Sequence, residues 1–223
     1  MIHNIRGAIF DIDGTLLDSM PIWGSVAGDY LRSCGCVPRP NLNDELRDLG
    51  GHQLAWYFQT HYGIRDSAAR IHGAIGRLLE DFYYNVAQLK DGAVQLLESF
   101  RAAGIRMCAA TATDRHLIAR ALERCGVVGY FGRIFTCGEE RTSKSRPDIY
   151  LRAADFLGTG VRETLVFEDA LYAIRSARGA GFPIVGVYDA SADDQQDEIK
   201  ALCDCYVYSL VGFDLSVLAG LWV

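Results

Sequence analysis

Short apolar runs alternate with longer amphipathic segments along most of the chain. Each apolar run has four to six residues, a length typical of strands that are buried on both faces. We expect strands at residues 5–10, 105–110, 133–136, 164–167, 183–187 and 205–208. Between them, apolar residues recur at helical spacing, which predicts helices at 92–103, 115–125, 148–157 and 170–180. This alternation predicts an α/β fold, with a doubly wound parallel sheet covered by helices on both faces.

One long interval breaks the alternation. From residue 19 to 89 the pattern contains no strand-like run and predicts helices at 22–33, 43–49, 52–62 and 67–84. An insertion directly after the first strand would stand over the carboxyl end of the sheet, where parallel sheets bind ligands. We therefore expect an α-helical cap domain at 17–90, inserted into a catalytic core formed by 1–16 and 91–223.

Composition and charge narrow the class of protein. A chain of 223 residues with 50% hydrophobic residues can bury a full core. The net charge is −6 and Lys and Arg are not clustered, which argues against nucleic-acid and anionic-membrane partners. The seven cysteines have no histidine nearby at zinc-ligand spacing, so we interpret them as reduced thiols. We expect a cytoplasmic protein, monomeric or homodimeric, whose partner is a small molecule.

Acidic, hydroxyl and ammonium side chains follow the ends of four expected strands. They are Asp11, Asp13, Thr111, Lys144, Glu168 and Asp169. The carboxyl ends of parallel strands meet at one edge of the sheet, so we expect these side chains to converge there. Several carboxylates in one cleft cannot all ionise without a cation, and Mg²⁺ suits one or two carboxylates, waters and a phosphate oxygen. A metal ion, a lysine, a hydroxyl and a carboxylate nucleophile together indicate phosphoryl transfer.

The nucleophile follows by elimination. The sequence has neither a G-x-S-x-G elbow nor a P-loop, and its cysteines have no triad-like partner. A carboxylate can instead form an acyl phosphate that water then cleaves. We assign attack and metal binding to Asp11, and proton transfer to and from the reacting oxygens to Asp13. Gly14 permits a tight turn after the pair, and Asp18 and Ser19 are expected to cap the next helix.

These residues carry a resemblance to the haloacid dehalogenase (HAD) superfamily. The stretch D-I-D-G-T-L-L-D-S resembles its first motif, Thr111 its second, Lys144 in K-S-R-P-D-I-Y its third, and F-E-D-A its fourth. The helical insertion is similar to the C1 cap of β-phosphoglucomutases, phosphonatases and many phosphatases. The resemblance implies a Rossmann-like core and Mg²⁺ held by Asp11, the Asp13 carbonyl and Asp169, with Glu168 binding directly or through water. It also implies that Thr111 and Lys144 hold the phosphoryl group.

Departures from the family patterns favour hydrolysis. Lysines occur only at Lys90, Lys144 and Lys200, so the body of the expected cap lacks the lysine that a phosphonatase needs. Trp23 stands about where a β-phosphoglucomutase has its histidine, while Asp13 argues against a dehalogenase. We predict a Mg²⁺-dependent phosphatase that acts on a small phosphate monoester. A phosphosugar mutase is the alternative, and a catalytically weak phosphoacceptor or ligand-binding HAD protein is the non-enzymatic one.

Four further residues are candidates for substrate binding. Thr113 and Arg115 lie beside Thr111, where they could contact the distal part of a substrate or cap a helix. Arg47 and His52 flank the glycine pair at 50–51, the part of the cap where similar proteins often carry specificity groups.

Overall fold

The computed structural model describes residues 5–46, 49 and 51–215, and it divides the chain into two compact units. The first unit comprises the chain up to Ser19 and from Ala87 onward, and the second comprises Met20–Val86. The two segments of the first unit are therefore separated in sequence by the whole second unit. The assignment of the second unit as a cap stays a prediction.

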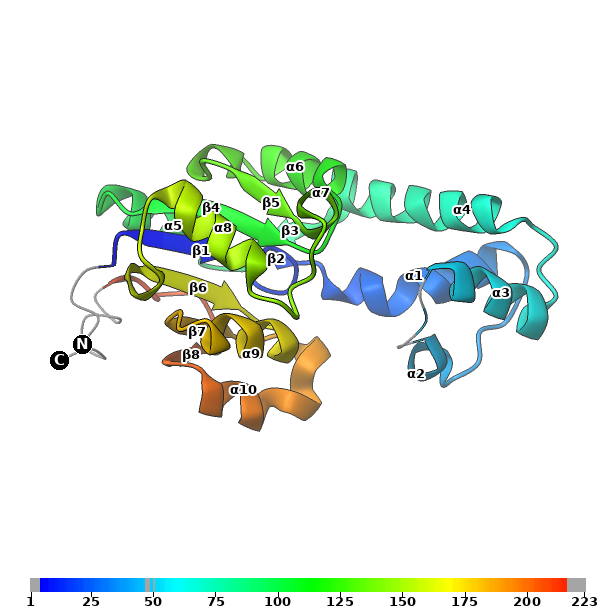
Figure 1. The fold of residues 1–223 in the computed structure, drawn as a ribbon. Coiled ribbons are helices and arrows are strands. Elements are labelled where there is room, and N and C mark those ends of the chain that lie inside the picture. Colours follow the sequence, from blue (N-terminus) through cyan, green and yellow to red (C-terminus); the bar gives the residue numbers. More distant parts are fainter. Residues whose placement is uncertain (1–4, 47–48, 50, 216–223) are drawn as a thin grey trace. The chain divides into compact units, whose positions relative to one another are not determined.

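The first unit is built on a six-stranded parallel sheet in the order β5-β4-β1-β6-β7-β8 (Figure 1). Its strands are β1 (Gly7–Phe10), β4 (Arg106–Thr111), β5 (Ile134–Thr136), β6 (Thr164–Glu168), β7 (Ile184–Val187) and β8 (Cys205–Val207). β1 lies between β4 and β6, and Phe10 is in register with Ala109 and Phe167. All six expected strands are confirmed, as is the α/β fold class.

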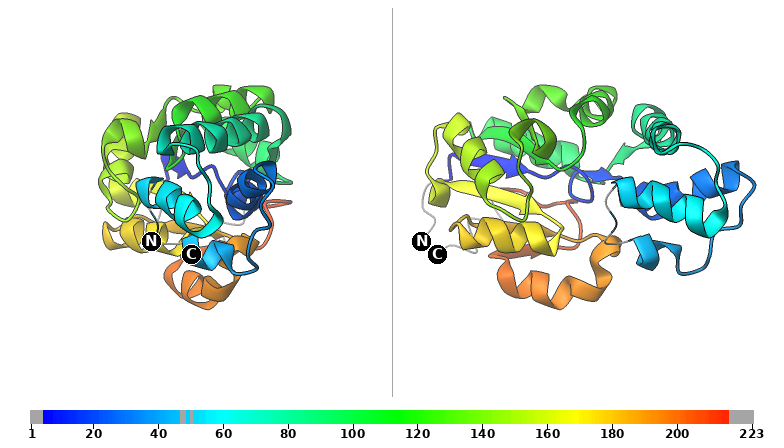
Figure 2. Two further views of the ribbon diagram at one scale, coloured as in Figure 1. Left: turned by 90° about the vertical axis from the view of Figure 1, so that its right-hand side faces the viewer. Right: turned by 45° about the vertical axis from the view of Figure 1, so that its right-hand side comes forward.

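Helices cover both faces of this sheet, as the two further views in Figure 2 show. They are α5 (Ala93–Ala102), α6 (Arg115–Arg124), α7 (Cys137–Glu140), α8 (Asp148–Leu157), α9 (Leu171–Gly179) and α10 (Gln196–Leu202). The described part of the unit also contains three short 3₁₀ helices: η2 (Val128–Tyr130), η3 (Val161–Glu163) and η4 (Ala190–Gln195). The predicted helices at 92–103, 115–125, 148–157 and 170–180 correspond to α5, α6, α8 and α9.

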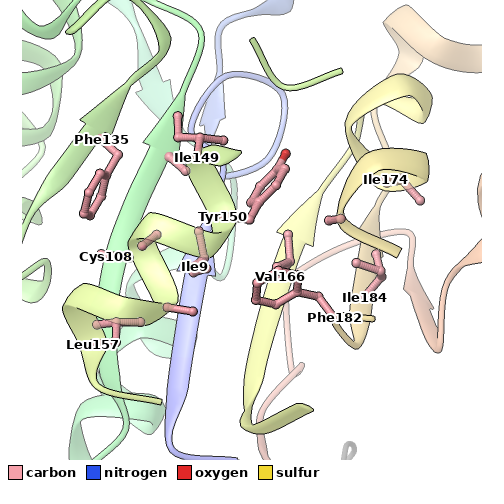
Figure 3. Close-up of a cluster of buried hydrophobic side chains, with 14 of the residues drawn as sticks. Ile9, Cys108, Phe135, Ile149, Tyr150, Leu157, Val166, Ile174, Phe182 and Ile184 are labelled. Carbon is pink, nitrogen blue, oxygen red and sulfur yellow. The ribbon is translucent and has the colours of Figure 1, made fainter. Parts of the chain in front are cut away.

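Two hydrophobic layers hold the helices on the sheet. Alternate strand side chains point to opposite faces, so Ile9 and Val166 pack with α8, α9 and α10 on one face (Figure 3). On the other face the rings of Phe10 and Phe167 stack at 4.4 Å, and both contact Phe100 of α5. Both layers hold the carboxyl ends of β1 and β6 in fixed positions.

A short antiparallel ladder in the first unit was not predicted. It pairs β2 (Leu17–Asp18) with β3 (Gln88–Leu89), and the Lys90 N–H donates to the Leu16 carbonyl beside it at 2.8 Å. The expectation that no strand lies between residues 19 and 89 is therefore wrong for β3. Two residues are too few to show the alternation of a strand, so only the pairing reveals them.

The second unit is helical. It contains α1 (Met20–Ser33), α2 (Leu42–Leu46), α3 (Gly51–Tyr62) and α4 (Ala68–Asp81), followed by one π-helical segment, η1 (Phe82–Val86). Its core includes Tyr30, Phe58 and Ile71, and the Tyr30 and Phe58 rings stack at 5.4 Å. The Ser67 hydroxyl accepts the Arg70 N–H at 3.3 Å and caps α4. No helix among the described residues of either unit is long and apolar enough to span a bilayer.

Candidate active site

A tight loop at the end of β1 positions the first two acidic residues. The Asp11 N–H donates to the Phe167 carbonyl of β6 at 3.0 Å, so this backbone still belongs to the sheet edge. Gly14 then adopts a φ of 79°, and its N–H donates to the Leu17 carbonyl at 2.9 Å. Residues with a side chain rarely adopt this left-handed conformation, which explains the glycine. The loop returns on itself, and the acids stay at the strand end.

Three carboxylates gather at this edge. Asp11 follows β1, Glu168 ends β6 and Asp169 comes next, and all three side chains are buried. Each offers one oxygen atom within 4.8 Å of the others, a grouping that could hold a metal ion. They come together because β1 and β6 are neighbours in the sheet, although they are separated by more than 150 residues of sequence. The predicted convergence of these residues is thus present in the described structure.

Lys144 supplies the positive charge inside this cluster. It lies between α7 and α8, and its ammonium group is buried. It donates to Oδ1 of Asp11 and, at 2.5 Å, to Oε1 of Glu168. Burial opposes the charge on Lys144, but the two carboxylates outweigh burial and raise the pKa of the lysine. Lys144 therefore remains positively charged at neutral pH.

One lysine does not balance three buried carboxylates. Burial, repulsion from Glu168 and weaker repulsion from Asp169 and Asp13 raise the pKa of Asp11 well above its usual range. Burial and Glu168 raise the pKa of Asp169 to about 7. In addition, Oε2 of Glu168 is buried and accepts no hydrogen bond from any described residue. The excess negative charge and the unpartnered oxygen both fit a site for a divalent cation.

Two hydroxyl groups that sequence reasoning did not assign to the site orient these carboxylates. Thr15 Oγ1 donates to Oδ1 of Asp169 at 2.8 Å, and Tyr150 Oη donates to Oε1 of Glu168 at 2.7 Å. Thr15 could have been suspected because it follows D-I-D-G directly. Tyr150 ends the stretch K-S-R-P-D-I-Y that resembles the third motif, although its position on α8 is otherwise that of an ordinary core residue.

Asp13 lies in a separate set of hydrogen bonds beside the cluster. Ser19 Oγ donates to its Oδ1 at 2.6 Å, and Thr111 Oγ1 donates to its Oδ2 at 3.4 Å. Thr111, at the end of β4, also accepts the Thr113 N–H at 3.1 Å. Ser19 directly precedes α1, where it was expected to cap the helix, and its hydroxyl also donates to Asp13. The two aspartates of the D-x-D pair therefore have different partners, which allows them different chemical roles.

The four candidates for substrate binding have different positions. Thr113 is buried next to Thr111. Arg115 forms an ion pair with Glu139 of α7 at 2.5 Å and donates to the Ile134 carbonyl at the start of β5 at 2.6 Å. Arg47 lies outside the described residues, as does the side chain of His52. Substrate binding by these residues stays a prediction.

The comparison with known proteins identifies the family. Residues 5–181 match the family model for haloacid dehalogenase-like hydrolases. The chain belongs to this family. The protein CbbY of Rhodobacter capsulatus is 28% identical to this HAD hydrolase, over 81% of this chain and 84% of its own length. Hexitol phosphatase A of Escherichia coli is 29% identical, over 84% and 85%.

A solved structure supports the same assignment. The crystal structure of CbbY from Rhodobacter sphaeroides in complex with phosphate superposes on this HAD hydrolase with a TM-score of 0.77. The two sequences are 25% identical, and the match covers 98% of this chain and 100% of that one. The predicted family and fold are confirmed, and the predicted class, a phosphoric monoester hydrolase, is confirmed at the level of the family and its phosphatase relatives.

Proposed function

We propose that this HAD hydrolase uses Mg²⁺ to hydrolyse a small phosphorylated metabolite, with Asp11 as the residue that becomes phosphorylated. The observation that carries the proposal is the buried set of three carboxylates around one lysine at the ends of β1 and β6. Such a set provides a nucleophile and places positive charge where phosphate oxygens bind. The names of hexitol phosphatase A and of the phosphoglycolate phosphatases among the relatives support a small phosphate ester as substrate.

The residues present suit magnesium. Asp11, Asp169 and the Asp13 carbonyl would hold the ion, with Glu168 bound directly or through water. When bound, Mg²⁺ supplies positive charge to the phosphoryl oxygens and favours the ionised form of the carboxylates. Lys144 provides a second cation from the protein itself, and it keeps Asp11 oriented through their ion pair.

In the first step, a carboxylate oxygen of Asp11 attacks the phosphorus atom of the ester. A bond forms between this oxygen and phosphorus, and the bond from phosphorus to the substrate's alcohol oxygen breaks with its electron pair leaving on that oxygen. Asp13, in its protonated form, gives its proton to the leaving oxygen, and the alcohol departs. Thr111, which contacts Asp13, would help to hold the phosphoryl group.

In the second step, water attacks the phosphorus of the aspartyl phosphate. Asp13, now a carboxylate, takes a proton from this water. The bond between phosphorus and the Asp11 oxygen breaks, which releases inorganic phosphate and restores Asp11. The hydrogen bonds from Ser19 and Thr111 hold the Asp13 carboxyl in place for both proton transfers.

A cytoplasmic location and a monomeric or homodimeric state stay predictions.

A phosphate-release screen tests the proposal. The protein is incubated with a panel of sugar, polyol, nucleotide and small-acid phosphates in the presence of Mg²⁺, with and without excess EDTA. We expect Mg²⁺-dependent phosphate release from at least one ester, and loss of nearly all release in Asp11→Asn, a variant of the same shape. Unchanged turnover in this variant would show that Asp11 is not the nucleophile. Isomerisation of a sugar phosphate without phosphate release would show a mutase instead.

A further inference from the structure

Glu168 has two carboxylate oxygens with very different surroundings. Its Oε1 accepts two hydrogen bonds, from Lys144 Nζ at 2.5 Å and from Tyr150 Oη at 2.7 Å. Its Oε2 is buried and accepts none from the described residues. An unsatisfied acceptor in a buried carboxylate is costly, so this asymmetry needs an explanation. Binding of a cation, or of water attached to it, would satisfy Oε2.

The position of Tyr150 determines which oxygen of Glu168 accepts the second hydrogen bond. Its side chain is fully buried in the hydrophobic layer between α8 and the sheet, with the Phe182 ring at 6.2 Å. Figure 3 shows its ring inside this layer, with the hydroxyl oxygen at its tip. Because packing fixes the ring, the position of the hydroxyl is fixed as well. A phenol keeps its proton at neutral pH, so the group stays a donor.

Lys144 alone would not hold the Glu168 carboxyl group in one orientation. Its ammonium group is shared with Asp11, and the terminal torsion of a glutamate side chain rotates readily. Without the second donor, either oxygen of Glu168 could turn toward Lys144. With it, both donors converge on one oxygen, and the other oxygen is kept available.

We propose that Tyr150 is a positioning residue for the metal site: its hydroxyl, together with Lys144, occupies Oε1 of Glu168 and so reserves Oε2 for the cation or its water. This inference rests on the proposed function, because it concerns the same metal site. It assigns a role in metal affinity to a residue that would otherwise be counted as part of the hydrophobic core.

The test is the Mg²⁺ affinity of Tyr150→Phe, measured without substrate by isothermal titration calorimetry. This variant keeps the ring and removes only the hydroxyl. Loss of a group that orients a metal ligand typically weakens metal binding by about 10- to 100-fold, and we expect a loss in this range. We also expect kcat to recover as Mg²⁺ is raised to saturation, with KM for the substrate little changed.

Tyr206→Phe is the matched control. Tyr206 belongs to the same unit, packs against the same hydrophobic layer and donates its hydroxyl to Gln196 rather than to a site residue. We expect its Mg²⁺ affinity to equal that of the wild type. Thermal denaturation of both variants shows whether they are folded.

A double-mutant cycle shows whether Tyr150 acts through Glu168. In a Glu168→Ala background, the additional change Tyr150→Phe should leave the remaining Mg²⁺ affinity unchanged, because the group that it positions is gone. An equal additional loss in that background would overturn the positioning role.

The remaining outcomes are distinct. If the wild type binds Mg²⁺ and Tyr150→Phe binds it within about twofold of the same affinity, far below the loss expected on removing such a partner, the inference is wrong and the proposed function stands. If Tyr206→Phe loses as much affinity as Tyr150→Phe, the effect is one of core packing and the inference is also wrong. If the wild type binds no Mg²⁺, the proposed function fails, and the inference fails with it.

Discussion

We expect the variant Asp169→Asn to make the metal-free protein more stable than the wild type at neutral and alkaline pH. Asp169 is 3% exposed, and burial with repulsion from Glu168 raises its pKa from 3.8 to about 7. Asparagine has the same shape and can still accept the hydrogen bond that Thr15 Oγ1 donates at 2.8 Å. The substitution therefore removes the charge and keeps the packing.

The size of the effect follows from the pKa difference. The folded protein binds a proton on Asp169 more tightly than the unfolded chain does, so stability falls as pH rises from the unfolded pKa through about 7. A difference of about three pKa units corresponds to at most about 4 kcal/mol of unfolding free energy above pH 8. The amide of the variant is neutral at every pH, so the variant would not lose this unfolding free energy. The free energy of unfolding of the variant should therefore exceed that of the wild type by little near pH 4. This difference should increase by roughly 2–3 kcal/mol between pH 5 and pH 8.

Urea denaturation in EDTA at several pH values measures this difference, and comparing the two proteins cancels the titrating groups that do not interact with Asp169. Addition of Mg²⁺ should stabilise the wild type and have little effect on the variant, since Asp169 is a proposed ligand. The variant should also lose phosphatase activity. If Asp169→Asn is less stable than the wild type at pH 8 without metal, or if its advantage does not grow with pH, the charge argument is refuted.

Three further variants test other parts of the site and fold. Asp13→Asn should keep the fold and lower kcat by about 10²- to 10⁴-fold, because it cannot transfer the proton, and a normal rate of phosphate release would exclude this role. Gly14→Ala should lower the free energy of unfolding by roughly 1 kcal/mol or more, since φ is 79° there, and unchanged urea denaturation would contradict this. Asp189→Asn removes the ion pair with Lys90 at 2.9 Å and should destabilise the protein at pH 7. Burial opposes ionisation of Asp189, but hydrogen bonds from Ser191 and Lys90 prevail and lower its pKa. The loss in free energy of unfolding of this variant should therefore be present above about pH 4 and become smaller as pH falls further. Denaturation curves that show the same loss at every pH would disprove this.

The local pattern of the sequence was enough to predict most of the fold. The helix expected at 148–157 is α8 with the same bounds, and the six strands lie within a few residues of their expected positions. The reason is that an element covered by others on one or both faces must repeat its apolar residues at the period of a helix or strand. β2 and β3 have no such signal, because each consists of two residues and is defined by its partner.

The sequence also predicted the chemical groups of the site, because the motifs place Asp11, Lys144, Glu168 and Asp169 at or near the ends of apolar runs. Only the tertiary structure decided which atoms meet. The Tyr150 hydroxyl reaches Glu168 on another element, and the Ser19 hydroxyl turns back to Asp13 instead of serving only as a helix cap. Periodicity reports which face of an element is buried, whereas the partner of a buried hydroxyl depends on how separate elements pack. That packing makes one oxygen of Glu168 an acceptor for two donors and leaves the other without a donor among the described residues.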